Sequence, residues 1–268
     1  MKRARLIAIA LLVVVVLACL AANLFAPGGY AQQFRAEPNA APSPSHWLGT
    51  DQLGRDRFAR LLYGTRVSLV LAPAAALLST ALAGLIGGLA GYRGGLWQQA
   101  ANAVTDLFLS LPWLFLLITV RALLPLNVSP AASVSVTFLL LGLLGWAGAA
   151  RVVCAHAAAL RTSDFVLQAR ASGLAGWRLA LRHVLPNLRP ILAAQLWISI
   201  PVFILSEANL GMLGLGVAEP LPSWGGLLRE LQELVFFNGE YWKLAPLVLL
   251  ILVVGSFELL VARREVGG

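Results

Sequence analysis

Long apolar runs separated by short polar stretches dominate this chain. A helix that crosses a bilayer needs roughly 20 apolar residues, because about 30 Å of hydrocarbon is spanned at about 1.5 Å per residue. Six stretches have this length and composition: Leu6–Phe25, Val67–Ala90, Ala100–Leu123, Ala132–Val153, Pro190–Leu213 and Leu244–Ala262. The pattern therefore predicts an all-α membrane protein with six transmembrane helices.

The polar stretches divide the chain into four parts, and none of them predicts a soluble domain. We expect an N-terminal transmembrane anchor at residues 1–26, a periplasmic loop at 27–66, a five-helix core at 67–262 and a short cytoplasmic tail at 263–268. Two loops interrupt the core, a cytoplasmic one at 154–189 and an outer one at 217–242. Within the first loop, prolines indicate an extended start, and Asp51–Arg66 is predicted to form a short surface helix.

Basic residues beside the apolar runs predict the orientation, since loops rich in Lys and Arg stay in the cytoplasm. Three basic residues precede the first run, and Arg151–Arg189 holds six arginines against the single acidic residue Asp164. Arg263 and Arg264 fall on the same side, whereas Val217–Trp242 carries four glutamates against one arginine. Both termini are therefore predicted to be cytoplasmic. The 27–66 loop, with five arginines outside, is an exception of the kind that long translocated loops allow.

The first run also suits a signal peptide, because basic residues precede an apolar core. Its length and the five later spans favour an anchor that is kept.

Composition agrees with a membrane protein. The chain is 59% hydrophobic and only 12% charged, whereas a soluble domain carries about 25% charged residues. The net charge of +8 does not indicate nucleic-acid binding, because many arginines flank apolar runs as topology signals do. Cys19 and Cys154 lie in or beside apolar runs without a metal-ligand spacing, so neither predicts a metal site.

The stretch Gln168–Asn187 breaks the apolar pattern with three arginines, one histidine, two glycines and one proline. Just before it, Thr162–Asp164 supplies residues that cap helix N-termini, so Phe165–Ala171 is predicted to form two helical turns. Gly173 is predicted to stop this helix, because glycine tolerates the left-handed conformation of a C-cap.

A second short helix is expected from Gly176 to Leu185. Trp177, Leu181 and Val184 are predicted to share its apolar face, and Arg178 and Arg182 to form a basic i, i+4 pair. Pro186 is expected to end this helix, because a proline ring clashes with a continuing helix.

The result is an amphipathic helix–bend–helix segment with a basic face. Composition alone leaves two interpretations open: a helix that lies on anionic headgroups, or a docking element for a cytoplasmic partner.

Five groups of residues, in chain order, carry a family resemblance. They are His46–Asp56 with Leu62–Leu69; Gly91–Gly95 with Asp106 and Pro112; Ala169–Ala171, Gly173 and Arg182–Asn187; Glu207-Ala208; and Leu213–Val217 with Pro222–Gly225. Together they resemble permeases of ABC importers, in the dipeptide/oligopeptide/nickel branch. The third group resembles the cytoplasmic "EAA" loop of that family.

The resemblance implies a type I ABC-importer-like permease in a bacterial inner membrane, with a coupling loop at 161–189 that docks on a separate ATP-binding subunit. The residues assigned to this loop are Asp164, Phe165, Ala169, Arg170, Gly173, Trp177, Arg178, Arg182, His183, Leu185, Pro186 and Asn187. It also implies a second homologous permease, two ATP-binding subunits and a periplasmic or lipid-anchored solute-binding protein. The implied substrates are di- and oligopeptides, with nickel or another small solute as the alternative.

Several positions depart from the family pattern. Leu167 stands where the family has the glutamate of its EAA loop, and Gln168 follows it. Gln98 and Ala103 replace an aspartate and an arginine of the inner loop, and Val261-Ala262 replaces a terminal glycine-aspartate.

ATP is expected to bind on another chain, together with its Mg²⁺. A P-loop needs a lysine after a glycine-rich turn, and neither of the two lysines, Lys2 and Lys243, follows one. We therefore expect this chain to hold no cofactor and no metal ion.

Polar residues inside the predicted spans are costly, so they usually face protein or water. Glu207, with Asn209 beside it, indicates either a substrate pathway or a hydrogen bond between helices. Asp106 is expected to brace the fold, Glu258 to be structural, and Arg121 to extend toward the outer interface.

Gly84, Gly87, Gly88 and Gly91 place small residues at helical spacing, which lets helices approach closely.

Two other function classes remain possible at this stage. An intramembrane enzyme would need two polar groups that meet in a wet cavity, such as Asp106 and Glu258, but no H-E-x-x-H or G-x-S-x-G motif occurs. We therefore assign no catalytic residue. A stand-alone secondary transporter would be indicated by inverted repeats and broken central helices, and the sequence shows neither.

Overall fold

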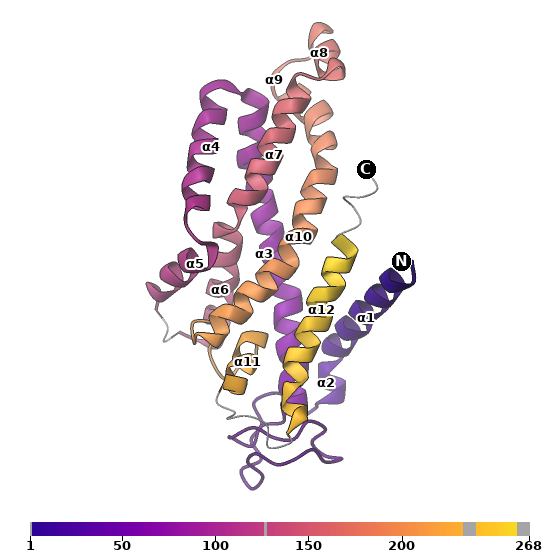
Figure 1. The fold of residues 1–268 in the computed structure, drawn as a ribbon, viewed down its shortest axis with the longest axis vertical. Helices are drawn as coiled ribbons and strands as arrows, with labels where there is room; N and C mark the ends of the chain where they lie inside the picture. Colours follow the sequence, from indigo (N-terminus) through magenta and orange to yellow (C-terminus); the bar gives the residue numbers. More distant parts are fainter. Residues whose placement is uncertain (1, 126–127, 233–239, 262–268) are drawn as a thin grey trace. The chain divides into compact units, whose positions relative to one another are not determined.

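The computed structural model describes residues 2–125, 128–232 and 240–261, and these form helices joined by loops (Figure 1). The helices are α1 (Lys2–Leu20), α2 (Ala22–Phe25), α3 (Arg57–Arg93), α4 (Gly95–Ser110), α5 (Trp113–Ala122), α6 (Pro130–Leu144), α7 (Trp146–Arg161), α8 (Asp164–Ala171), α9 (Gly176–Leu179), the π-helical turn η1 (Ala180–Val184), α10 (Leu185–Met212), α11 (Trp224–Gln232), the 3₁₀ turn η2 (Tyr241–Leu244) and α12 (Ala245–Val261). The predicted tail 263–268, with Arg263 and Arg264, lies outside the described residues.

Five of the described helical segments are long and apolar enough to cross a membrane: Arg3–Leu20, Arg57–Arg93, Pro130–Arg161, Gly176–Met212 and Tyr241–Val261. Helices α4 and α5 together are also long and apolar enough for one span, although they meet at an angle of 83°. If this bent pair is counted as one span, the described residues contain six. The predicted span Ala100–Leu123 is therefore not one continuous helix, because it is broken between Ser110 and Trp113. Leu111 has an extended backbone at the bend, as expected for a residue before a proline, here Pro112.

The predicted surface helix Asp51–Arg66 is also wrong. Helix α3 begins at Arg57 and runs without a break to Arg93. Asp56 defines the start, because its carboxylate accepts a hydrogen bond from the backbone N–H of Ala59 at 2.8 Å. Asp51 belongs to a turn instead, where its Oδ1 accepts hydrogen bonds from the backbone N–H groups of Leu53 and Arg55.

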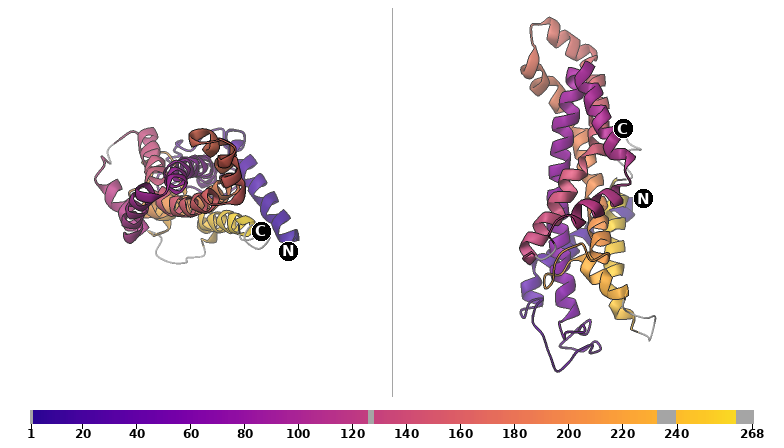
Figure 2. Two further views of the ribbon diagram at one scale, coloured as in Figure 1. Left: turned by 90° about the horizontal axis from the view of Figure 1, so that it is seen from above. Right: turned by 90° about the vertical axis from the view of Figure 1, so that its left-hand side faces the viewer.

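The chain divides into two compact units. The first contains residues 1–72, 120–138 and 200–268, and the second contains 73–119 and 139–199. In the first unit α1 lies beside α12, and α11 packs against α12 (Figures 1 and 2). Helix α2 is tied to the start of α3 by a hydrogen bond of 2.6 Å from the Tyr63 hydroxyl to Asn23.

In the second unit α4 packs against α7, and Trp146 of α7 lies against Phe108 of α4 with ring centroids 5.4 Å apart. The glycines of α3 confirm the prediction of close packing. A Cβ on Gly87 would meet the carbonyl group of Ala150, and one on Gly91 would meet the carbonyl oxygen of Cys154. The backbones of α3 and α7 can approach this closely only because these positions lack side chains.

Candidate functional site

Helix α8 ends in a Schellman turn in the second unit. Gly173 has φ of +86°, its N–H donates to the carbonyl of Arg170 at 3.0 Å, and the N–H of Leu174 donates to the carbonyl of Ala169 at 3.1 Å. These two bonds satisfy carbonyls that the end of a helix leaves open. The predicted role of Gly173 as the stop of the first short helix is confirmed.

The predicted side-chain cap at the start of α8 is wrong. Ser163 occupies the N-cap position with an extended backbone, but its hydroxyl donates to the carbonyl of Leu160 at 2.6 Å. Helix α7 ends only two residues earlier, and its last carbonyl groups have no partner within the helix. The Ser163 hydroxyl therefore bonds to one of them instead of capping α8.

The expectation that Pro186 ends the second short helix is wrong as well. Helix α9, the π turn η1 and α10 form one continuous helical segment from Gly176 to Met212. The wide π turn lies immediately before Pro186, which relieves the clash between the proline ring and the carbonyl of Arg182 four residues earlier. The nearby carbonyl of His183 accepts a hydrogen bond from the Asn187 side chain at 2.6 Å.

The π turn also changes the buried face of this segment. Leu179 and Val184, five residues apart, are buried, whereas Trp177 and Leu181 are exposed. The predicted apolar face of Trp177, Leu181 and Val184 is therefore wrong, since it assumed an α-helical period throughout.

A small core fixes the segment to α7. It consists of Val153, Ala157, Val166, Ala169, Leu179, Val184 and Leu188. The hydroxyl of Tyr92, at the end of α3, adds a hydrogen bond of 2.9 Å to the carbonyl of Gly176. Of the residues assigned to the loop, Ala169 belongs to this core, and His183 and Pro186 are half-buried.

The outer surface of the segment is apolar and basic. Its exposed large apolar side chains are Phe165, Leu167, Trp177, Leu181 and Leu185, and the polar residues assigned to the loop that are exposed are Asp164, Arg170, Arg178, Arg182 and Asn187. The Arg178 guanidinium lies 5.9 Å from the centre of the Trp177 ring. In Figure 1, α8 lies beyond the ends of α4 and α7, so the segment presents this surface at one end of the second unit.

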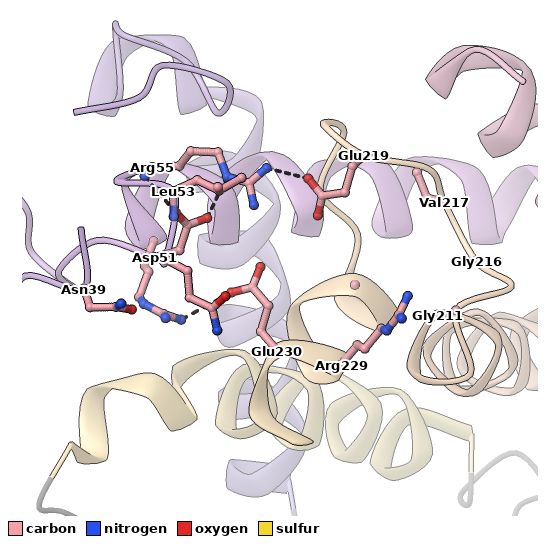
Figure 3. Close-up of a pocket in the computed structure, with 14 residues that line it drawn as sticks. Asn39, Asp51, Leu53, Arg55, Gly211, Gly216, Val217, Glu219, Arg229 and Glu230 are labelled. Atoms are coloured by element: carbon pink, nitrogen blue, oxygen red, sulfur yellow. Dashed lines mark hydrogen bonds and ion pairs between the residues drawn. The ribbon is translucent and has the colours of Figure 1, made fainter. Parts of the chain in front are cut away.

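The first unit contains an ionic cluster that joins the start of α3 to the segment around α11 (Figure 3). Arg60 is only 1% exposed, and its Nη2 lies 3.0 Å from Glu219 and 2.9 Å from Glu230. Arg55 pairs with Asp51 at 2.6 Å and also with Glu219. Arg57 pairs with Glu230 at 3.3 Å.

Sequence reasoning missed this cluster. It had recognised the stretch that contains Asp51 and Arg55 only as a family resemblance. The glutamates lie about 160 residues further along the chain, with no local signal of pairing.

The cluster shifts the pKa of its members. Burial would raise the pKa of Glu219, but hydrogen bonds and charge attraction from Arg60 and Arg55 outweigh it and hold this pKa below its usual value. Burial dominates at Glu230 and raises its pKa, although Arg60 and Arg57 oppose the shift. Burial would lower the pKa of Arg55, but the hydrogen bonds and the charge attraction of Asp51 and Glu219 together outweigh it and raise this pKa.

Polar residues inside the spans are held by neighbours of the same unit. Glu207 is fully buried and accepts a hydrogen bond from the Ser68 hydroxyl at 3.2 Å, which favours the interhelical interpretation over a substrate pathway. Asn209 beside it is exposed. Asp106 forms an ion pair with Arg151, so it links α4 to α7.

Arg121 corrects a prediction. It does not extend to the interface but is 1% exposed, where Nη2 lies 3.4 Å from the Ser133 hydroxyl. Ser133 in turn donates to the carbonyl of Gly216, so this polar group lies inside the fold of the first unit.

Long apolar helices define a multi-pass membrane protein, and one helical segment of it displays apolar and basic side chains at its surface. The chain belongs to the family of binding-protein-dependent transport system inner membrane components, which matches residues 83–264.

Named relatives agree with the family. The chain is 30% identical to the dipeptide transport system permease protein DppC of Bacillus subtilis (strain 168), over 87% of its own length and 71% of the relative. It is 29% identical to the oligopeptide transport system permease protein OppC of the same organism, over 89% and 76%. It is 30% identical to DppC of Alkalihalophilus pseudofirmus, over 97% and 84%.

The chain is therefore a permease subunit, a membrane component of a transport system and not an enzyme. This finding overturns the alternative of an intramembrane enzyme, because the relatives are transport permeases. It also overturns the alternative of a stand-alone transporter, because transport in this family depends on a binding protein. In general, such permeases work with ATPase and substrate-binding partners.

Proposed function

We propose that this chain forms half of the pathway of an ATP-driven importer of di- and oligopeptides, together with a second homologous permease. The names of the relatives support peptides as the substrate class. Two ATP-binding subunits hold ATP and Mg²⁺, and a solute-binding protein delivers the peptide from outside. Both termini and the 154–189 loop face the cytoplasm.

The coupling element in this proposal is the segment Asp164–Asn187. The observation that carries it is the group of exposed large apolar side chains, because an apolar patch rimmed by polar residues marks an interaction surface. The segment is fixed by its own core and by the turn at Gly173, so a push on it moves α7 and α9 together. Arg170, Arg178 and Arg182 add basic contacts for an acidic groove.

The proposal is tested by affinity purification of the full-length tagged chain from its own membranes. We expect a second permease and two ATP-binding subunits to co-purify. Phe165→Glu with Trp177→Glu should release the ATP-binding subunits and keep the second permease, because both side chains are exposed on the segment. The matched control is Leu96→Glu with Trp97→Glu, a pair of exposed apolar residues on α4. Retention of the ATP-binding subunits by the first double variant would contradict the coupling role.

Gly173 offers a second test, in cells that depend on the importer for peptide uptake. Gly173→Pro replaces φ of +86° by about −65° and removes the donor to Arg170, so uptake should be lost while the protein stays inserted. Gly173→Asn is the control, because asparagine tolerates the left-handed conformation. Equal uptake by the two variants would rule out a role for the turn. The orientation can be tested with Ser172→Cys and a thiol reagent that does not cross the membrane. Labelling from outside intact cells would contradict the proposed cytoplasmic position of the 154–189 loop.

A further inference from the structure

The ionic cluster of the first unit borders a pocket of about 380 Å³. Its walls come from the stretch between Asn39 and Arg57, from the end of α10 with the loop that follows it, and from α11. This size is within the range of pockets that hold small ligands. Two walls contain glycines, Gly211, Gly214, Gly216 and Gly226, so backbone and charged groups provide much of the surface.

The pocket lining carries three arginines, Arg55, Arg57 and Arg229, and three carboxylates. Arg60 does not line the pocket but binds Glu219 and Glu230 from behind, so the whole site has four guanidinium groups against three carboxylates. Its three carboxylates, on Asp51, Glu219 and Glu230, are each bound to at least one arginine of the cluster. Arg229 adds a further positive charge to the lining. Its side chain is exposed and forms no hydrogen bond or ion pair with the residues that the structure describes. Among the residues that the structure describes, this guanidinium is therefore left without a partner, and it is available to a bound group.

The backbone beside Arg229 leaves room for this guanidinium. Gly214 has φ of +77°, and a Cβ there would lie 2.9 Å from Nη1 of Arg229. Figure 3 shows Arg229 on α11, and Glu219 on the loop at another side of the pocket. More than half of the Glu219 side chain is exposed although it is bound to two arginines, so it can accept a further donor.

We propose that this pocket binds a short peptide with free termini, with Arg229 on the terminal carboxylate and Glu219 on the terminal ammonium. A guanidinium matches a carboxylate with two parallel hydrogen bonds, which fixes the orientation of the peptide. The choice of a peptide over another zwitterion rests on the proposed function. An acidic side chain of a partner protein would satisfy Arg229 too, but it would bring no ammonium group to Glu219.

The test uses the full-length chain in lipid nanodiscs and isothermal titration calorimetry with the dipeptide Ala-Ala. We expect saturable binding that weakens at least about tenfold for Ala-Ala amide, which lacks the carboxylate, and for Arg229→Gln. Arg35→Gln is the matched control, because Arg35 is an exposed arginine of the same outer stretch that does not line the pocket. It should bind Ala-Ala as the unmodified chain does. Equal melting temperatures of the two variants show that Arg229→Gln folds.

Three outcomes would overturn the proposal: no saturable binding of Ala-Ala, binding of the amide as tight as that of the acid, or undiminished binding by Arg229→Gln. A photocrosslinker at position 229 that captures a partner protein in the assembled complex, with no binding of Ala-Ala, would identify a protein side chain as the occupant and also overturn it. Co-purification of the importer subunits is independent of these results. The proposal for the pocket can therefore be refuted while the proposed function stands, and the proposed function can be refuted while the pocket binds the peptide.

Discussion

Arg60 gives the sharpest test of how the first unit is held together. Its side chain is 1% exposed and lies within 4 Å of three carboxylates: 3.6 Å from Asp51, 3.0 Å from Glu219 and 2.9 Å from Glu230. Arg60→Gln keeps a polar side chain but removes the charge. Three acidic groups would then share two arginines, Arg55 and Arg57.

The expected loss follows from the burial of Arg60 and of two of its partners, Asp51 and Glu230, whereas Glu219 is more than half exposed. Removal of one member of a buried ion pair costs about 3–5 kcal/mol, because the other charge stays buried without compensation. Glu219 keeps Arg55, and Glu230 keeps Arg57, so we expect the lower end, about 3 kcal/mol. By the scaling for a domain of about 200 residues, this corresponds to a melting temperature lower by roughly 6–12 °C.

Buried cysteines provide the assay. Cys19 is 1% exposed in the first unit, so a thiol-reactive dye reaches it only on unfolding. Cys154→Ala removes the thiol of the second unit, which leaves a signal from the first unit alone. Arg35→Gln in the same background is the control for loss of one exposed arginine. A melting temperature of Arg60→Gln within roughly 2 °C of this control would refute the view that the buried cluster holds the unit together.

Three further substitutions probe other parts of the structure, each by melting in detergent. Gly91→Ala should destabilise by about 1–3 kcal/mol, because its Cβ would meet the carbonyl oxygen of Cys154, whereas Gly88→Ala should be nearly neutral since its nearest neighbour is 3.7 Å away; equal effects would contradict the close packing. Leu179→Ala should lower the free energy of unfolding by about 2–5 kcal/mol and Leu181→Ala by much less, since only Leu179 is buried. The reverse order would mean that the segment keeps an ordinary α-helical period. Glu219→Gln should lower the melting temperature at neutral pH but not in acid. Because the pKa of Glu219 is lowered in the folded protein, its ionised carboxylate stabilises the fold above the usual glutamate pKa, and this stabilisation is lost as the pH falls through the lowered pKa. A pH-independent difference would exclude the ion pairs as its cause.

Local signals in the sequence were sufficient for much of the fold. Apolar runs located the membrane helices, because the thickness of the hydrocarbon layer sets their length. Gly173 was recognised as a helix stop since only its left-handed backbone was required, and this is a property of one residue. The glycines of α3 identified a close helix contact for a similar reason.

Predictions failed where a distant or alternative partner decided the structure. Pro186 continues a helix because a π turn precedes it, and no residue type announces a π turn. Ser163 offers its hydroxyl to α7 instead of capping α8. Arg121 is buried beside Ser133, which only the folded chain brings near. The pairing of Arg60 with Glu219 and Glu230 needs contacts across about 160 residues or more, so no local pattern reveals it.

The π turn at Ala180–Val184 contains one residue more than an α-helical path would use, so it works as a phase shift in the helix from Gly176 to Met212. Each residue of an α-helix turns the chain by about 100°. A one-residue deletion within the turn would keep the helix continuous and yet rotate Trp177 and Arg178 by about that angle around the axis of α10. The length of this turn thus sets the direction of the exposed surface that we propose docks on an ATP-binding subunit. Insertions or deletions in the turn would change this direction without changing any residue on the surface.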